Sequence, residues 1–408
     1  MTVNRFIKMI IFLLLPANIL AQPSSLALVR EQKPADEVRQ WLWRQSDSGD
    51  IFPFLRATRE KVEFLDADSH VSASYNLLPL SKIQSSPDNE VVAFIERLSD
   101  EADIENRKFL YHIVRFDGRE IFSVLVSCVA DEPYPAIYVS DKGDALLVDG
   151  AKGEVKIFRA QAEAEKIIDL FPDDVYNFEK PIDAAISADG KWFSVVAQKH
   201  PSFFSEEKLE YVSGEPHLFL FSIDGEKQWQ RQLKKATGAS TAISPDGYYI
   251  VASHYSAQTS SAPELQTSIY YINGKEVLNL PLRFRLCKFS PDGSTLWLAD
   301  TRDLYQVDLQ SKNYNHYKLI SDDTNQLIMD FALQKEGEVV ILTGKAVFST
   351  DHFEYRELKI LQFANHQFSA FNTDFADETM ILPSIFVLKK QLAFGLTNGI
   401  KIFRDQRE

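Results

Sequence analysis

The sequence holds few of the residues and motifs that catalytic or metal-binding proteins require. Its 408 residues include two cysteines and eight histidines, and no two histidines are three or four positions apart, the usual spacing of a local metal site. Gly-x-Ser-x-Gly, phosphate-loop and dinucleotide-binding motifs are also absent from the sequence. We therefore predict no catalytic residues, no metal and no cofactor.

Glycine, proline and positive charge are scarce as well. Sixteen glycines and 17 prolines are too few for a long flexible linker, and a hydrophobic content of 45% excludes a disordered chain. Forty-four basic residues against 58 acidic ones give a net charge of −14. Such a surface repels phosphate, so we expect no nucleic-acid partner.

One long apolar run lies at the N-terminus. Arg5 and Lys8 precede an unbroken apolar stretch from Met9 to Leu15, and Pro16 follows it. This pattern predicts a signal peptide over residues 1–21, cleaved after Ala21, and hence a periplasmic or secreted protein. An uncleaved anchor is the alternative, but the run is shorter than the roughly 20 residues of a membrane span. We expect no transmembrane span in the mature chain.

A short motif recurs along the rest of the chain. Ile186–Gly190, Ile243–Gly247 and Phe289–Gly293 each end in Ser-x-Asp-Gly and are each followed by a β-type run. Proline presets φ at the second turn position, Asp accepts hydrogen bonds from backbone amides, and Gly accepts a positive φ, so each copy predicts a tight hairpin. The aspartates of the repeats, Asp88, Asp189, Asp246 and Asp292, are therefore assigned to turn geometry rather than to chemistry.

A second hairpin follows the first one in each repeat. Asp224-Gly225, Asp117-Gly118 and Asn273-Gly274 stand between alternating apolar runs, which is a strong hairpin signal. Each unit thus has four antiparallel strands, here termed a to d, and units of about 45–50 residues predict the blades of a β-propeller. We predict an all-β, seven-bladed propeller with approximate units 77–125, 133–169, 181–234, 239–282, 284–319, 327–361 and 380–406. Eight blades are the alternative if residues 26–75 contain another.

The last unit shows three strands, so its fourth must come from elsewhere. An N-terminal strand would protect the open edge, and Lys61–Leu65, or a neighbouring strand, is predicted to pair with Gly399–Phe403. We accordingly expect an N-terminal extension over residues 22–76 and a propeller over residues 77–408. Within the extension, Ala35–Gln45 is predicted as a short amphipathic helix with Trp41 and Trp43, which either caps the propeller rim or docks a partner.

The two cysteines are predicted to stay unpaired. Cys287 falls in the first strand of a unit, whereas Cys128 falls between two units far from it around the ring. A disulfide needs Cα atoms within about 7 Å, which this separation does not allow.

The Ser-Pro-Asp-Gly turns resemble the WD40-like β-propellers of bacterial export compartments, and Asp224–Trp229 is similar to blades of quinoprotein-type propellers. The resemblance covers about residues 77–408 and implies the fold; propellers host many activities, so the function stays open. One hypothesis is an exported, non-catalytic module that binds a protein or glycan of the cell envelope. The alternative is a lactonase-like or quinoprotein-like enzyme, which would need polar ligands on strands a; these strands are mostly apolar.

The candidate binding residues lie in unusually long loops. The b–c loops 96–108, 198–215 and 254–267 and the d–a connection 171–178 are expected on one face, where long loops are often functional. Aromatic anchors with surrounding carboxylates suit a basic partner; solvated loops without a partner are the alternative. The residues chosen are Phe171, Tyr176, Phe178, Phe203, Phe204, Tyr211, Asp100, Glu101, Asp103, Glu206 and Glu207. The oligomeric state is not predicted.

Overall fold

The computed structural model describes most of the chain from residue 26 to residue 405. The residues not described within that range are 46–48, 80, 99–106, 130–132, 161, 173–181, 200–202, 206–209, 213, 257–263, 323, 335–337, 350–351, 365–366, 372–374, 376–377 and 389–390. At 162–165, 203–204, 210–212 and 405 only the backbone is considered. In this part of the chain no helix is long and apolar enough to cross a membrane.

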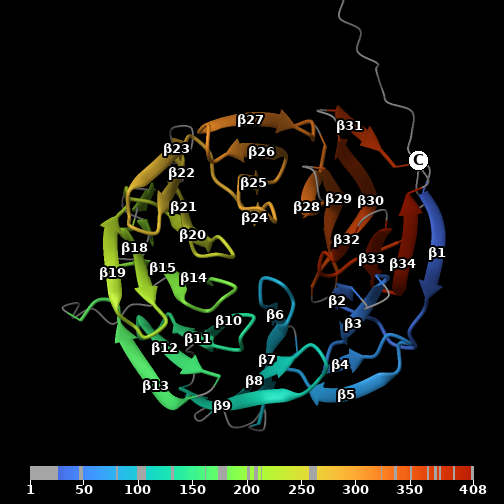
Figure 1. Cartoon of the computed structure of the whole chain (residues 1–408), viewed down its shortest axis with the longest axis horizontal. Helices are drawn as coiled ribbons and strands as arrows, with labels where there is room; N and C mark the ends of the chain where they lie inside the picture. Colours follow the sequence, from blue (N-terminus) through green and yellow to red (C-terminus); the bar gives the residue numbers. More distant parts are fainter. Residues whose placement is uncertain are drawn as a thin grey trace, which may run out of the picture.

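Eight four-stranded antiparallel sheets form a ring, with one sheet as each blade (Figure 1). Blade 1 consists of β2 (Gln40–Gln45), β3 (Ile51–Ala57), β4 (Lys61–Leu65) and β5 (Val71–Asn76), and blade 2 of β6 (Gln84–Ser85), β7 (Val91–Arg97), β8 (Arg107–Arg115) and β9 (Glu120–Cys128). Blade 3 consists of β10 (Ala136–Val139), β11 (Ala145–Asp149), β12 (Glu154–Arg159) and β13 (Ala162–Asp169). Blade 4 consists of β14 (Ile182–Ile186), β15 (Trp192–Gln198), β18 (Pro216–Ser222) and β19 (Lys227–Gln232). A two-stranded hairpin, β16 (Phe203–Ser205) and β17 (Glu210–Val212), is inserted between strands b and c of blade 4.

The other four blades follow the same order from the ring axis outward. Blade 5 consists of β20 (Gly238–Ile243), β21 (Tyr249–Ser256), β22 (Glu264–Tyr271) and β23 (Glu276–Leu280), and blade 6 of β24 (Leu286–Phe289), β25 (Thr295–Ala299), β26 (Asp303–Asp308) and β27 (Asn313–Lys318). Blade 7 consists of β28 (Gln326–Leu333), β29 (Val339–Phe348), β30 (Phe353–Ala364) and β31 (Gln367–Ala370). Blade 8 consists of β32 (Ile385–Leu388), β33 (Gln391–Leu396), β34 (Gly399–Asp405) and the N-terminal strand β1 (Leu26–Gln32).

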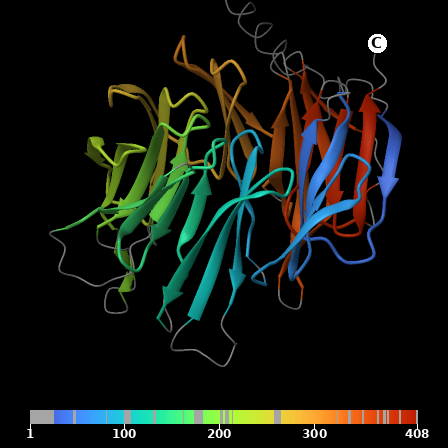
Figure 2. The ribbon, with the colours of Figure 1, turned by 60° about the horizontal axis from the view of Figure 1, so that its bottom comes forward.

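The N-terminal strand closes the ring. Strand β1 pairs antiparallel with β34, with Leu28 opposite Phe403 and Gln32 opposite Ile400. Figure 2 shows the blue β1 beside the red β34 at the outer edge of the ring. Closure by an N-terminal strand is confirmed, but the choice of Lys61–Leu65 is wrong, because that segment is strand c of blade 1. Alternation of apolar and polar residues identifies a segment as a strand, but it does not show which other strand pairs with it.

The predicted number of seven blades is also wrong, because residues 40–76 form a complete blade of their own. The helix expected over Ala35–Gln45 is instead partly strand β2. Trp41 and Trp43 are two positions apart, so both point to one face of that strand, and both are 3% exposed. They pack with Ala393, Ile400 and Ile402 of blade 8 in the cluster that joins the two ends of the chain.

The repeated turns between strands a and b are held by hydrogen bonds within each turn and, in blades 2 to 5, from one turn to the next. Ser187 Oγ donates to Asp189 Oδ1 at 2.8 Å, and Trp192 N donates to Ser187 Oγ at 3.1 Å. The same arrangement recurs at Ser244 with Asp246 and at Ser290 with Asp292. Successive turns are also linked, since Asp88 N donates to Asp141 Oδ1 at 3.0 Å, Asp141 N to the Ala188 carbonyl, and Ala188 N to the Pro245 carbonyl. The aspartates of the three clearest repeats thus serve the turns, as predicted.

Apolar side chains of neighbouring blades interleave to form the core. Between blades 3 and 4, for example, Leu146 and Val155 pack with Phe193 and Phe219. Cys128, at the end of β9, and Cys287, in β24, are both free thiols, which confirms the prediction of no disulfide between them. Desolvation raises the pKa of the half-buried Cys287 thiol above its ordinary value, which favours the protonated form.

Candidate functional site

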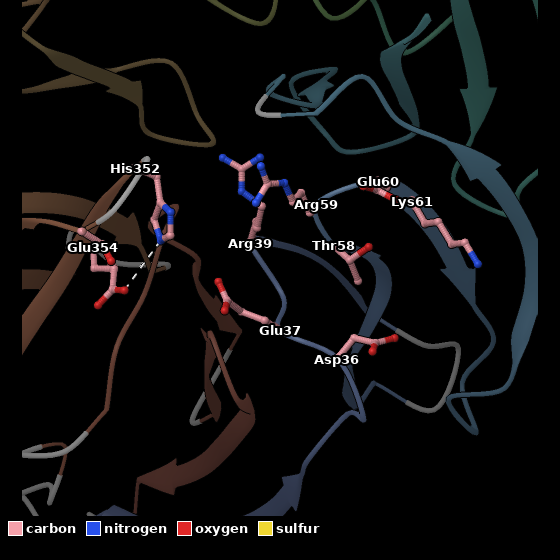
Figure 3. Close-up of a pocket in the computed structure, with 10 residues that line it drawn as sticks. Asp36, Glu37, Arg39, Thr58, Arg59, Glu60, Lys61, His352 and Glu354 are labelled. Carbon is pink, nitrogen blue, oxygen red and sulfur yellow. Dashed lines mark ion pairs between the residues drawn. The ribbon is translucent and has the colours of Figure 1, made fainter. Parts of the chain in front are cut away.

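A pocket of about 850 Å³ lies on the face that carries the b–c and d–a connections, close to where the ring closes. Three segments line it (Figure 3). Asp36, Glu37 and Arg39 belong to the link between β1 and β2, and Thr58 to Lys61 to the turn between β3 and β4. Ser349, His352 and Glu354 come from the β29–β30 hairpin of blade 7, about 300 residues later in the chain.

Backbone hydrogen bonds fix the link that carries Arg39. The Val38 amide donates to the Thr397 carbonyl at 2.9 Å, and the Arg39 amide donates to the Ala57 carbonyl at 2.7 Å. The Arg39 carbonyl in turn accepts from the Leu382 amide at 3.0 Å. Arg39 is therefore held between blades 1 and 8, and the pocket depends on both ends of the chain.

The pocket contains charges of both signs, with the two arginines toward its middle. Figure 3 shows the side chains of Arg39 and Arg59 extending into the open space, with His352 facing them from blade 7, whereas Lys61 and Asp36 point away. His352 Nε2 lies 3.6 Å from Glu354 Oε1. The Glu37 carboxylate also points into the open space, so the pocket offers groups of both charges beside the two arginines.

Glu354 is already engaged by neighbours on its own hairpin. Arg356 donates to Glu354 Oε2 from Nη2 at 2.9 Å and from Nε at 3.2 Å. These bonds, helped by one from the Ser349 hydroxyl, hold the pKa of Glu354 below its ordinary value despite some desolvation. The carboxylate therefore acts as a fixed negative charge at the rim rather than as a proton donor or acceptor near neutral pH.

An exposed aromatic pair stands at the end of the same hairpin. Phe348 and Phe353 are opposite each other in the β29–β30 ladder, and they are 65% and 58% exposed. Their ring centroids are 5.2 Å apart in an edge-to-face arrangement. Phe348 and Phe353 adjoin Ser349 and His352 of the pocket in sequence, and alternation along β30 turns Phe353 to the face opposite Glu354. The pair and the pocket therefore share one hairpin, and together they are here termed the hairpin site.

The loop-based prediction concerns other parts of the molecule. Phe171 is 9% exposed and packs against Phe219 and His217 at centroid distances of 5.7 and 5.5 Å, in the core between blades 3 and 4. Phe203 and Phe204 lie in β16 and Tyr211 in β17, a hairpin three blades from blade 7; their side chains are not described. Seven more predicted residues lie outside the described part of the chain: Tyr176, Phe178, Asp100, Glu101, Asp103, Glu206 and Glu207.

Within the described residues, one group of side chains is close enough to hold a metal ion, and it lies outside the pocket. Asp66, Asp68 and His70 are all exposed on the turn between β4 and β5. Asp66 Oδ1 accepts hydrogen bonds from the amides of Asp68 and His70, and the bond from the His70 amide is the main cause that lowers the pKa of Asp66. The hydrogen bonds of the turn therefore account for the close approach of these three side chains.

Comparison with known proteins shows the fold. No protein-family model and no curated protein matches the sequence. The C-terminal WD40 domain of Sif2 is similar in structure, with a TM-score of 0.55 and 8% identity over 94% of this chain and 99% of that domain. The fold is that of a WD40-like β-propeller.

Two further solved propellers have lower TM-scores. The β-propeller domain of the Trilobed protease from Pyrococcus furiosus gives 0.44 at 12% identity, over 80% of this chain and 95% of that domain. Virginiamycin B lyase from Staphylococcus aureus gives 0.42 at 9% identity, over 93% of this chain and 99% of that protein. Function must be argued from the site itself, because unrelated activities share this fold.

Proposed function

We propose that the chain is an exported, non-catalytic β-propeller that binds a protein partner of the cell envelope at the hairpin site. The observation that carries the proposal is the exposed pair Phe348 and Phe353 on the same hairpin as a pocket that contains Arg39 and Arg59. Large aromatic side chains dominate binding energy when a partner covers them, and a folded protein gains little by leaving two of them in water.

The pocket supplies specificity beside this apolar anchor. Arg39 and Arg59 suit a carboxylate, because guanidinium groups match it with two parallel hydrogen bonds. The partner would therefore insert an acidic side chain or a chain terminus between the arginines. The carboxylates of Glu37, Glu60 and Glu354, which also line the pocket, would repel partners that place further acidic groups there.

A structural role for the polar groups near the ring axis also favours a binding module over the lactonase-like or quinoprotein-like alternative. Asp183 of β14 accepts from the Tyr138 hydroxyl at 3.0 Å and from the Thr241 amide at 2.8 Å. This carboxylate thus connects the inner strands of blades 3, 4 and 5. Thr241 Oγ1 in turn donates to the Val251 carbonyl at 3.1 Å, and the neighbouring Ala184, Ala185 and Ala242 are apolar.

Photo-crosslinking in the cell of origin tests the proposal. A benzoylphenylalanine replaces Phe348 in one strain and Tyr248 in another; Tyr248 is a 50% exposed aromatic in the a–b turn of blade 5, on the opposite face. We expect one protein to crosslink from position 348 and not from position 248. That protein, once purified, should bind the wild-type chain, and the crosslink should disappear when Arg39 and Arg59 are both changed to Ala.

Two results would contradict the proposal. One is equal crosslinking from both positions, which indicates contact without a specific face. The other is a crosslinked protein that, when pure, binds the wild-type and the Arg39→Ala/Arg59→Ala chains with the same affinity. Circular dichroism of each variant confirms that the fold is retained.

A further inference from the structure

A buried histidine without a partner lies on the side of the ring, outside the hairpin site. His254 of β21 is 4% exposed, and neither ring nitrogen has a hydrogen-bond partner among the described residues. Burial, reinforced by the charge of Lys234, holds the pKa of the imidazole below its ordinary value despite Glu264. The ring is therefore neutral at pH 7, with one nitrogen that can donate and one that can accept. Buried polar atoms of this kind normally have partners.

His254 faces a groove between blades 4 and 5. The groove has a volume of about 360 Å³ and runs between the outer strand β19 with its continuation to Lys234 and the face of blade 5. Gln266, Ser268 and Tyr270 of β22 line it beside His254. A smaller space of about 30 Å³, enough for one or two water-sized groups, also borders His254 and is lined by Ser256 and Glu264.

The two cations of the groove, Arg231 and Lys234, already contact other groups of the chain. Arg231 donates to the Gly274 carbonyl at 3.1 Å, and its guanidinium carbon lies 5.4 Å from the centroid of the Tyr270 ring. Lys234 Nζ lies 3.7 Å from Glu264 Oε1, a carboxylate of the smaller space, and Glu276 is the carboxylate that lines the groove itself. Each cation of the groove is thus already bound by another group of the chain, so neither is left to attract an ion.

The remaining polar groups both donate and accept hydrogen bonds. Gln266 Nε2 donates to Ser268 Oγ at 3.2 Å and to Asn279 Oδ1 at 3.1 Å, which orients the amide and leaves the Gln266 oxygen as an acceptor. Imidazole, amide and hydroxyl are the groups that match alcohol hydroxyls, because each hydroxyl is itself both donor and acceptor. A ligand rich in hydroxyls and without charge fits this set better than a phosphate, a carboxylate or an amine.

We propose that the groove between blades 4 and 5 is a second binding site, which takes a neutral oligosaccharide and contacts it through His254, Gln266 and Ser268. The site is separate from the hairpin site: it lies on other blades and shares no residue with it. The oligosaccharide supplies the hydrogen bonds that His254 lacks within the chain.

Side-chain ¹⁵N NMR of the mature chain tests this proposal directly. The probes are neutral oligomers of glucose, mannose, galactose and N-acetylglucosamine at millimolar concentration, with inorganic phosphate and a sulfated oligosaccharide as charged comparisons. At least one neutral oligomer should shift the His254 ring nitrogens, and neither charged probe should do so. His254→Phe should weaken the affinity for that oligomer about tenfold or more, since one or two hydrogen bonds are lost. His254→Gln should retain part of it.

A histidine on another blade serves as the control. His316→Phe changes a ring that stacks on Tyr305 and contacts Asp303 in blade 6, away from the groove, so the oligomer should bind as before. The proposal is overturned if no neutral oligomer moves the His254 signals, if only a charged probe moves them, or if His254→Phe binds as tightly as the wild type. The NMR measurement uses the unmodified chain, so it decides even if a variant does not fold.

Discussion

Gly395→Ala should destabilise the protein because it places a methyl group against Trp41. Gly395 lies in β33 of blade 8, and an ideal Cβ built on it would come within 2.7 Å of Trp41 Cβ and Cγ. Trp41 cannot easily move away. It is 3% exposed, its Nε1 donates to the Leu396 carbonyl at 2.9 Å, and its ring lies against Trp43 at a centroid distance of 6.4 Å.

The size of the effect follows from this lack of room. Carbon atoms in contact are ordinarily about 3.5–4 Å apart, so the strand or the indole must shift by about 1 Å. Overpacking of this kind costs about 1–3 kcal/mol in the free energy of unfolding. Trp41→Ala alone should cost about 3–5 kcal/mol, because it leaves a cavity in the closing core. In the double variant the methyl group fills part of that cavity, so the combined cost should be smaller than the sum.

Urea unfolding of chains that begin at Gln22, followed by far-ultraviolet circular dichroism, gives the four free energies of the cycle. We expect a coupling of at least about 0.5 kcal/mol between Gly395→Ala and Trp41→Ala. The control pair, Gly395→Ala with Tyr248→Ser, should be additive, because Tyr248 lies on blade 5. Additivity of the first pair would refute the contact between blades 1 and 8, and with it the eight-bladed closure.

Three further changes test the closure and the interior. A chain that begins at residue 34 lacks β1 and exposes the edge of β34, so it should melt at a lower temperature and associate, as measured by calorimetry and size-exclusion chromatography; unchanged behaviour would contradict the pairing. Trp43→Phe removes the donor to Ser384 Oγ (2.7 Å) and should cost about 1 kcal/mol in urea unfolding; no loss would mean that this bond contributes nothing. Burial raises the pKa of Asp183 above its ordinary value near 3.8, so the folded chain binds this proton more tightly than the unfolded chain. The contribution of Asp183 to stability therefore falls as pH rises from 3.8 through the raised pKa. The difference in the free energy of unfolding between the wild type and Asp183→Asn should decrease over that pH range. A difference that does not change with pH would contradict the prediction.

The sequence was informative where local chemistry determines local structure. The Ser-x-Asp-Gly turns place β14–β15, β20–β21 and β24–β25 correctly, and the second hairpins turn at Gly225 and Gly274, whose φ values are +75° and +78°. These turns need particular residues at particular positions, so the sequence itself records them. Blade 1 was missed because the sequence Ser46-Asp47-Ser48-Gly49 between its first two strands matches the motif only in part, and because Trp41 and Trp43 suit either a helix or a strand.

Contacts between distant segments could not be inferred in this way. Arg39 and His352 share a pocket only because β1 closes the ring, which no local pattern near either residue records. The burial of individual aromatic residues could not be inferred from local sequence patterns either. Phe171 stands in an apparently exposed loop and is core, whereas Phe348 stands in a long strand and is 65% exposed. The neighbours that decide burial come from other blades.

The affinity of the crosslinked partner for a Phe348→Ser/Phe353→Ser chain tests the central claim most directly. Isothermal titration with the purified partner should give an affinity at least about 30-fold lower than for the wild type, since a buried aromatic anchor is worth about 2 kcal/mol or more. Tyr248→Ser should leave the affinity unchanged, and both variants should unfold at the wild-type urea concentration because the changed side chains are exposed. Equal affinities for the wild type and the Phe348→Ser/Phe353→Ser chain would contradict a binding role for the hairpin site.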